Sequence, residues 1–139
     1  MGRGVAGRRP GGAPMTVFTL DLGYNSPPLS ANDRPHYRVR ARITKQIRTT
    51  TWALAKQAKL PTDCAHVTVQ LHYRPRDKRR RDPSNLMPTQ KACVDGLVDA
   101  GLVPDDCQEF VTELVPAIHP AEKGSEGSLW LTISIGDSQ

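Results

Sequence analysis

The chain has 139 residues, of which 37% are hydrophobic and 24% are charged, and this length and composition fit one folded domain with a buried core. Its three cysteines show no CxxC spacing, which argues against a disulfide framework and a zinc knuckle and favours a reducing cytoplasm. No apolar stretch approaches the length of a membrane span, and the N-terminus lacks the apolar core of a signal peptide, so no membrane partner is expected.

The net charge of +5 hides a strong asymmetry along the chain. Residues 1–81 hold 17 of the 19 Lys and Arg residues but 4 of the 14 Asp and Glu residues, so the remainder is acidic. A basic part followed by an acidic part can hold a polyanion with one and a divalent cation with the other. Alternatively the two parts neutralise each other, and composition does not decide between these interpretations.

The first residues differ in composition from the rest. Residues 1–14 consist largely of Gly, Pro and Arg, and they are predicted to form a disordered tail. Met15 precedes the first strand-like run and offers a second start of translation. The tail is interpreted as a spare extension, with non-specific DNA contact as the alternative.

Six elements are predicted after the tail, in the order β-α-β-α-β-β. They cover residues 17–22, 36–60, 66–73, 88–100, 110–118 and 129–135. Thr49–Thr51 weakens the first helix locally, Pro88 belongs in the first turn of the second, and Gly101 caps its end. His66 and His72 lie on the polar face of a strand and are interpreted as solvated. The order predicts a single small α/β (α+β) domain, a mixed sheet with helices packed on it.

The informative polar residues lie around the second predicted helix. A basic cluster precedes it, formed by Arg76, Lys78, Arg79, Arg80 and Arg81. Carboxylates and one amide follow, at Asp82, Asn85, Asp95, Asp105 and Asp106. A helix that folds back across the sheet can bring both ends of this segment together, and oxygen ligands of this kind suit Mg²⁺. Phosphodiester hydrolysis needs an activated water and a cation at the leaving oxygen, which Lys91 can supply, while the Arg cluster would grip the DNA backbone.

Each of these residues also has an ordinary structural interpretation. Asp82 could be a helix N-terminal charge, Lys91 and Asp95 an i,i+4 ion pair, and Asp105 and Asp106 part of a loop. The Arg run could be solvated surface, or it could bind nucleic acid without chemistry. An aromatic content of 5% argues against an RNA-binding protein that relies on base stacking. Spacing alone leaves these alternatives open.

A resemblance adds to this pattern. Arg-Arg-Arg-Asp-Pro-Ser-Asn (79–85), a Lys six residues later, Val-Asp-Gly-Leu-Val-Asp-Ala-Gly (94–101) and Pro-Asp-Asp (104–106) together resemble the signature of RusA-type Holliday junction resolvases. The interval between Asn and Lys is similar to that in versions carried by bacteriophages of actinobacteria. The likeness covers residues 15–136, so residues 15–137 are expected to form a RusA-like endonuclease domain.

The resemblance implies a homodimer that binds four-way DNA junctions and cuts two strands symmetrically with Mg²⁺ or Mn²⁺, without a small-molecule cofactor. It implies catalytic roles for Asp82, Lys91 and Asp106, and a metal pocket formed by Asp82, Asp106, Asn85, Asp95 and, as an orienting neighbour, Asp105. Better-known members carry a second acidic residue where this chain has Ser84, so the site lacks one charge. The alternative is a catalytically weakened protein of the same fold that binds junctions or other nucleic acid.

Overall fold

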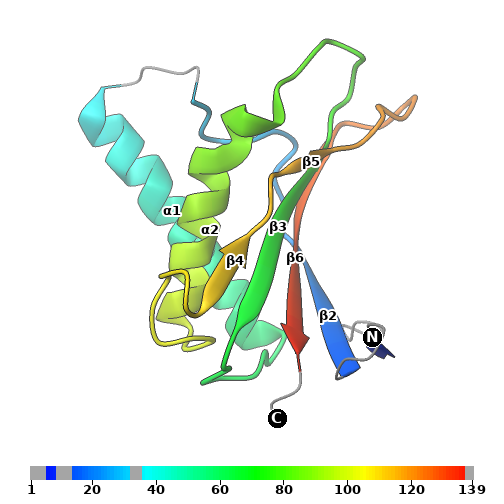
Figure 1. The fold of residues 1–139 in the computed structure, drawn as a ribbon. Coiled ribbons are helices and arrows are strands. Elements are labelled where there is room, and N and C mark those ends of the chain that lie inside the picture. Colours follow the sequence, from blue (N-terminus) through cyan, green and yellow to red (C-terminus); the bar gives the residue numbers. More distant parts are fainter. Residues whose placement is uncertain (1–5, 9–13, 32–35, 137–139) are drawn as a thin grey trace.

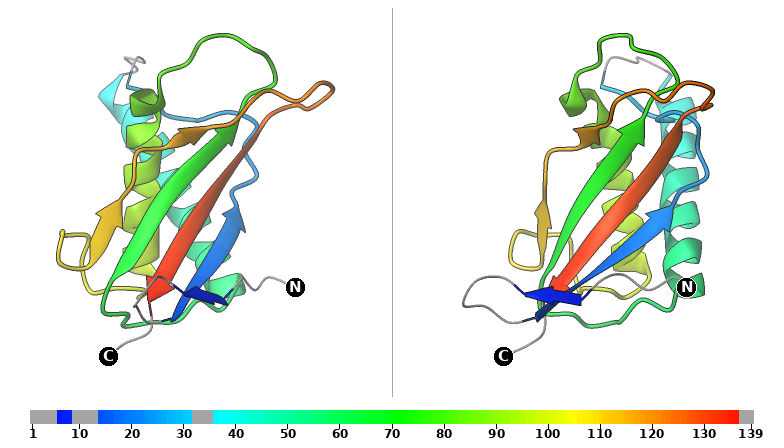
Figure 2. Two further views of the ribbon diagram at one scale, coloured as in Figure 1. Left: turned by 45° about the vertical axis from the view of Figure 1, so that its right-hand side comes forward. Right: turned by 90° about the vertical axis from the view of Figure 1, so that its right-hand side faces the viewer.

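The computed structural model describes residues 6–8, 14–31 and 36–136, which form the α/β domain that the sequence predicts (Figure 1). Two helices cover one face of a mixed open sheet, and the other face carries no helix (Figure 2). The elements are β1 (Ala6–Arg8), β2 (Pro14–Asp21), α1 (Tyr37–Gln57), β3 (Val67–Arg74), the 3₁₀ helix η1 (Pro83–Leu86), α2 (Met87–Asp99), β4 (Val111–Glu113), β5 (Ala117–Ile118) and β6 (Ser128–Gly136).

The sheet has the strand order β1-β2-β6-β3-β4, and β5 also pairs with β3. β2, β6 and β3 pair antiparallel, whereas β4 and β5 run parallel to β3. Burial alternates along β3 and β6, as the alternating sequence predicts, because every second side chain faces the helices. The core between sheet and helices includes Val67, Val69, Leu71, Leu129, Leu131, Ile133, Cys93, Val94 and Leu97.

The two helices meet closely at Gly96. A Cβ built at this position would lie 2.4 Å from the carbonyl oxygen of Arg48 and 2.8 Å from Cβ of Thr51. α1 passes through its Thr49–Thr51 run without a break, and the hydroxyl of Thr51 donates a hydrogen bond to the carbonyl of Ile47 at 2.9 Å. The Thr49–Thr51 run, which was predicted to weaken α1, is therefore the place where α1 packs closely against α2. The second helix has Pro88 in its first turn and Gly101, at φ +89°, just after its end, both as predicted.

The single strand predicted at residues 110–118 is instead two short strands, β4 and β5. Between them, the side chain of Gln90 from α2 takes the place of a strand partner. Its Oε1 accepts a hydrogen bond from the Leu71 N–H at 2.7 Å, and its Nε2 donates to the Leu114 carbonyl at 2.9 Å. Pro116 has no N–H to contribute to a ladder. A buried amide on the helix thus completes the hydrogen bonding that the broken strand leaves open.

The tail and the two histidines also differ from expectation. Ala6–Arg8 pairs antiparallel with β2, and Pro14 is the first residue of β2, so these parts of the tail are strands. Residues 1–5 and 9–13, like residues 32–35 of the predicted loop, lie outside the described residues. His66 and His72 are half-buried and hydrogen-bonded, not solvated. His72 bridges the His119 ring at 2.9 Å and the Thr132 hydroxyl at 2.9 Å.

Two expectations about the class of protein are met within the described residues. The three cysteines form no disulfide. Neither described helix combines the length and the apolar character that crossing a bilayer requires.

Candidate nucleic-acid interface and carboxylate site

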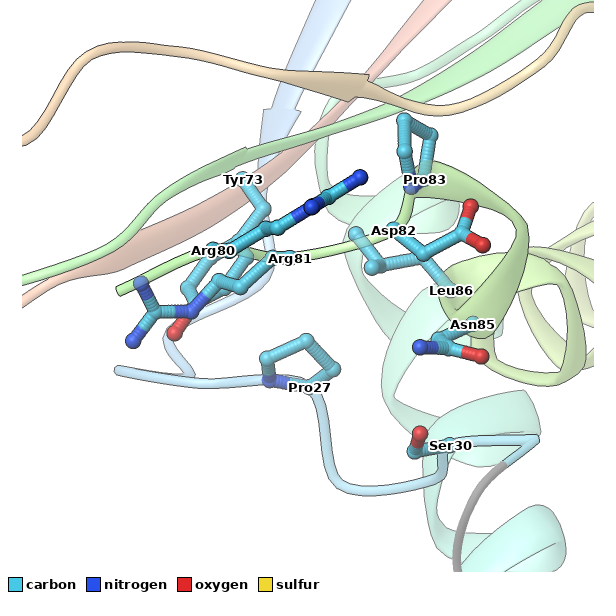
Figure 3. Close-up of a pocket in the computed structure, with 9 residues that line it drawn as sticks. All are labelled: Pro27, Ser30, Tyr73, Arg80, Arg81, Asp82, Pro83, Asn85 and Leu86. Carbon is cyan, nitrogen blue, oxygen red and sulfur yellow. The ribbon is translucent and has the colours of Figure 1, made fainter. Parts of the chain in front are cut away.

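A solvent-open hollow of about 720 Å³ lies where β3 gives way to η1 (Figure 3). Its lining combines cations, a carboxylate and an amide: Pro27, Ser30, Tyr73, Arg80, Arg81, Asp82, Pro83, Asn85 and Leu86. In Figure 3 one guanidinium lies on the side of Tyr73, away from Asp82, and the other extends toward Pro83 and Asp82, with Asn85 below Asp82. The hollow can therefore bind a negatively charged group at its arginines and a cation at Asp82 and Asn85.

The wall opposite η1 is the segment after β2, and α2 holds it in place. The Thr89 hydroxyl donates to the Leu29 carbonyl at 2.7 Å and accepts from the Leu29 N–H at 3.3 Å. The Ala31 N–H donates to the Asn85 carbonyl at 3.1 Å. Thr89 is fully buried, so this clamp is protected from water. Sequence reasoning did not single out Thr89, because nothing local distinguishes it from any other threonine in a helix.

The basic loop, residues 75–81, is organised around its own acidic residue. Asp77 forms ion pairs with Arg81 at 2.8 Å and Arg79 at 3.2 Å. Hydrogen bonds from Arg79, followed by one from Arg81, hold the pKa of Asp77 well below its usual range. Arg81 is largely covered and lies over the Tyr73 ring, 5.7 Å from its centroid. Arg81 thus has a role in shaping the loop.

The other cations of the loop remain available. Arg76, Lys78 and Arg80 are exposed, and among the described residues no carboxylate forms an ion pair with any of them. Of the five cations predicted to contact DNA, these three can therefore bind phosphate without first leaving a partner.

Asp82 is both the N-cap of η1 and the exposed carboxylate of the hollow. Its Oδ1 accepts hydrogen bonds from the N–H of Ser84 at 3.0 Å and from its hydroxyl at 2.9 Å. These two bonds, the backbone one first, lower the pKa of Asp82. No described cation forms an ion pair with this carboxylate, so Oδ2 remains open to solvent or to a ligand.

A second cluster forms on the flank of α2. Lys91 donates a hydrogen bond to Oδ2 of Asp106, and its Nζ lies 3.6 Å from Oδ1 of Asp95. The bond to Asp106 raises the pKa of Lys91, and in return it lowers the pKa of Asp106. Asp105 accepts from the Asp106 N–H at 2.7 Å and so orients the turn. Lys91 is therefore a fixed cation at neutral pH, unsuited to act as a base.

The described residues do not gather all the predicted ligands into one site. In this part of the chain no group of three or more Asp, Glu, His or Cys side chains is arranged to hold a metal ion. Asp82 and Asn85 offer oxygen donors of the type that a hydrated Mg²⁺ takes, because it needs only one or two carboxylates. Asp95 and Asp106 instead share the single ammonium group of Lys91. The residues thus fit a mostly hydrated ion at the hollow and do not fit a closed cage.

No protein-family model matches the chain, and no curated protein matches it in sequence. Among solved structures, it is similar to the OmpA-like domain of FopA1 from Francisella tularensis subsp. tularensis SCHU S4, at 13% identity and a TM-score of 0.40, over 98% of this chain and 83% of that one. It is also similar to a chain of the HypE-HypF complex, at 15% identity and a TM-score of 0.36, over 93% of this chain and 34% of that one. Neither likeness is strong enough to carry an argument.

Proposed function

We propose that this chain is a metal-dependent endonuclease that cuts branched DNA, like the RusA-type Holliday junction resolvases that its motifs resemble. One observation carries the proposal: Arg80, an exposed cation for which the described residues provide no ion pair, lines the same hollow as the exposed carboxylate of Asp82, and Arg76 and Lys78 lie in the same basic loop. Phosphodiester cleavage requires this combination, because the backbone must be held by cations while a carboxylate supports the metal ion.

The residues would divide the work between binding and chemistry. Arg76, Lys78 and Arg80 would bind the phosphates on either side of the scissile bond. Asp82, with Asn85 beside it, would hold Mg²⁺ or Mn²⁺, which when bound polarises the phosphate and lowers the pKa of a coordinated water. Asp106, with its neighbours Asp95 and Asp105, holds the ammonium group of Lys91.

Lys91 would serve as a cation for the negative charge that develops on the leaving oxygen. Its raised pKa keeps it protonated at neutral pH, so it can neutralise that charge but cannot take a proton from water. In the proposed enzyme, Asp106 is thus a positioning residue for Lys91.

The proposal extends to assembly and place of action. A four-way junction has two-fold symmetry, so a homodimer with one site per subunit would make the paired cuts that resolution requires. The substrate is cellular or bacteriophage DNA, and the enzyme would act in the cytoplasm.

The test is cleavage of a synthetic four-way junction by wild type, Asp82→Asn and Asp106→Asn, in Mg²⁺ and in Mn²⁺, with linear duplex as the control substrate. Wild type should nick the junction in symmetry-related strands and leave the duplex largely intact. Both variants should bind the junction like wild type in EDTA yet lose cleavage. Absence of cleavage by wild type in either metal ion, at low and at physiological salt, would refute the proposal.

A second function is favoured by a specific observation, the hydrogen bond from the Ser84 hydroxyl to Asp82. A neutral hydroxyl there leaves the hollow with a single carboxylate, which suits a protein that binds junctions and cuts them poorly. This alternative predicts tight junction binding by wild type in EDTA and no gain in cleavage on adding Mg²⁺ or Mn²⁺.

A further inference from the structure

The solvent face of α1 carries an unusual concentration of positive charge. The helix Tyr37–Gln57 contains six Lys or Arg residues and no Asp or Glu. Like charges three and four residues apart repel each other and destabilise a helix. The sheet needs only the opposite face of α1, where Ile47, Thr51 and Ala55 are buried. The fold therefore does not explain why the exposed face is cationic.

The exposed cations line up in a row. Arg38, Arg42, Lys45, Thr49 and Trp52 follow at intervals of four, three, four and three residues, so they lie on one side of the helix. All five are exposed, Trp52 to 42%. We call the first three, which span about 10 Å along the axis, the basic stripe. No apolar side chain interrupts it, and Trp52 lies two turns beyond it.

The basic stripe is not neutralised within the described part of the chain. Arg48, on the neighbouring side of the helix, pairs with Asp99 of α2 at 2.5 Å, but no described carboxylate forms an ion pair with Arg38, Arg42 or Lys45. Beside the stripe runs a hollow of about 660 Å³, whose lining includes Tyr37, Arg40, Ala41, Thr44, Lys45, Arg48, Thr49 and Asp99. Lys45 of the stripe lines this hollow together with Arg40 and Arg48, so the hollow continues the positive charge of the stripe on one side.

The stripe lies at the same end of the molecule as the basic loop. In all views α1 begins at the end where the chain arches from β3 to η1, and it runs from there toward the opposite end (Figures 1 and 2). The two cationic surfaces are separated in sequence, but the elements that carry them lie toward the same end of the fold. A polyanion held by the loop could continue along the helix.

We propose that the basic stripe of α1 binds the phosphate backbone of a DNA duplex arm, as a contact surface additional to the basic loop. The inference rests on the proposed function only in taking branched DNA as the ligand. Phosphate binding requires cations and no apolar anchor, and it agrees with the composition of the stripe. A helix that docks on a protein partner presents apolar anchors at intervals of three and four residues, and the stripe has none.

The experiment measures junction binding by fluorescence anisotropy in EDTA, from 50 to 200 mM salt. It compares wild type with two double variants, one in the first half of α1 and one at its C-terminal end. Arg42→Gln with Lys45→Gln removes two cations from the stripe. Lys56→Gln with Lys59→Gln removes two exposed cations, also three residues apart, from the last turn of α1 and the residues just after it. Because both variants lose the same charge, a difference between them reports position and not net charge.

Two lost phosphate contacts should reduce the slope of log K against log salt by about 1.8. Over the fourfold rise in salt, wild type should then lose about twelvefold more affinity than the stripe variant does. The Lys56/Lys59 variant should keep the slope of wild type. Equal effects of the two variants would overturn the inference, since the charge would then act without a defined contact. The inference would also be overturned if the stripe variant bound the junction as tightly as wild type. The stripe would then bind a different partner, such as an acidic protein surface.

The outcome can be separated from that of the proposed function. If the stripe variant binds like wild type while Asp82→Asn still abolishes cleavage, the inference fails and the nuclease stands. If the stripe variant loses affinity but wild type never cuts in Mg²⁺ or Mn²⁺, the nuclease fails and the DNA-binding stripe stands. If both hold, the stripe variant should need a higher protein concentration than wild type to cut the junction.

Discussion

Replacing Gly96 by alanine tests the packing that fixes the two helices relative to each other. α2 carries Lys91 and Asp95, and α1 carries the basic stripe, so their contact determines how the carboxylate cluster and the stripe lie relative to one another. The added Cβ would lie 2.4 Å from the Arg48 carbonyl oxygen, whereas Cβ atoms essentially never approach another heavy atom more closely than 3.0 Å. The obstacle is helix backbone, which cannot rotate away as a flexible side chain would.

Two opposing terms give the size of the effect. Alanine is favoured over glycine in a helix interior by about 1 kcal/mol. Inserting a methyl group into close-packed structure costs about 1–3 kcal/mol, and the upper end applies because α1 itself must move. The net prediction for Gly96→Ala is a loss of about 2 kcal/mol in the free energy of unfolding, or roughly 8 °C in Tm for a domain of this size.

Urea unfolding followed by far-UV circular dichroism measures this change. Ala53→Gly, at an exposed position of α1, supplies the control, because it reports helix propensity without packing and should cost about 1 kcal/mol. If Gly96→Ala is as stable as wild type or more stable, propensity outweighs the contact, and the close approach of the helices at this residue is not as described.

Three further predictions concern the site and the sheet. Ser84→Asp should raise the Mg²⁺-dependent rate of junction cleavage, because it adds a carboxylate beside Asp82; an unchanged or lower rate would show that charge at this position is not limiting. Gln90→Leu should lower the free energy of unfolding in urea by about 2 kcal/mol, since it leaves the buried Leu71 N–H and the partly buried Leu114 carbonyl without their partner, and a loss below about 0.5 kcal/mol would contradict that role. Burial, and then the neighbouring His119, lower the pKa of His72, so the unfolded chain takes up this proton first and stability is lost as pH falls below about 6.5. Urea unfolding at pH 7.5 and 5.0 should therefore show a smaller loss for His72→Gln than for wild type, and equal losses would rule the histidine out as the cause.

Local sequence patterns were sufficient where each residue's environment follows from its neighbours along the chain. β3 and β6 could be predicted because one face of each is buried and burial therefore alternates. The failure at residues 110–118 has a physical reason: whether this stretch pairs continuously depends on Gln90, about 20 residues away, whose buried amide replaces the ladder. From the sequence alone, Gly96 is likewise only a residue of low helix propensity, because its close contact with α1 depends on how the two helices pack.

In the candidate site, too, features set by neighbouring residues could be predicted, whereas those set by distant residues could not. The position of Asp82 directly after a strand and before a helix could be read from the chain, and so could the i,i+4 pair of Lys91 and Asp95. The side chain that Asp106 reaches depends on how residues 101–110 turn back along α2, and no local pattern specifies that path. In the structure it reaches Lys91.

The charge asymmetry of the sequence can now be interpreted. Composition allowed two possibilities: either the basic part up to residue 81 and the acidic part after it neutralise each other, or each is available for a ligand of opposite charge. Among the ion pairs of the described residues, Arg48–Asp99 is the one that joins the two parts. The others lie within the basic loop or within the Lys91 cluster. Most of the cations on α1 and three on the basic loop therefore remain unneutralised near one end of the fold, and that unbalanced charge is retained at the cost of self-repulsion. This arrangement favours the proposed polyanionic ligand over mutual neutralisation of the two parts.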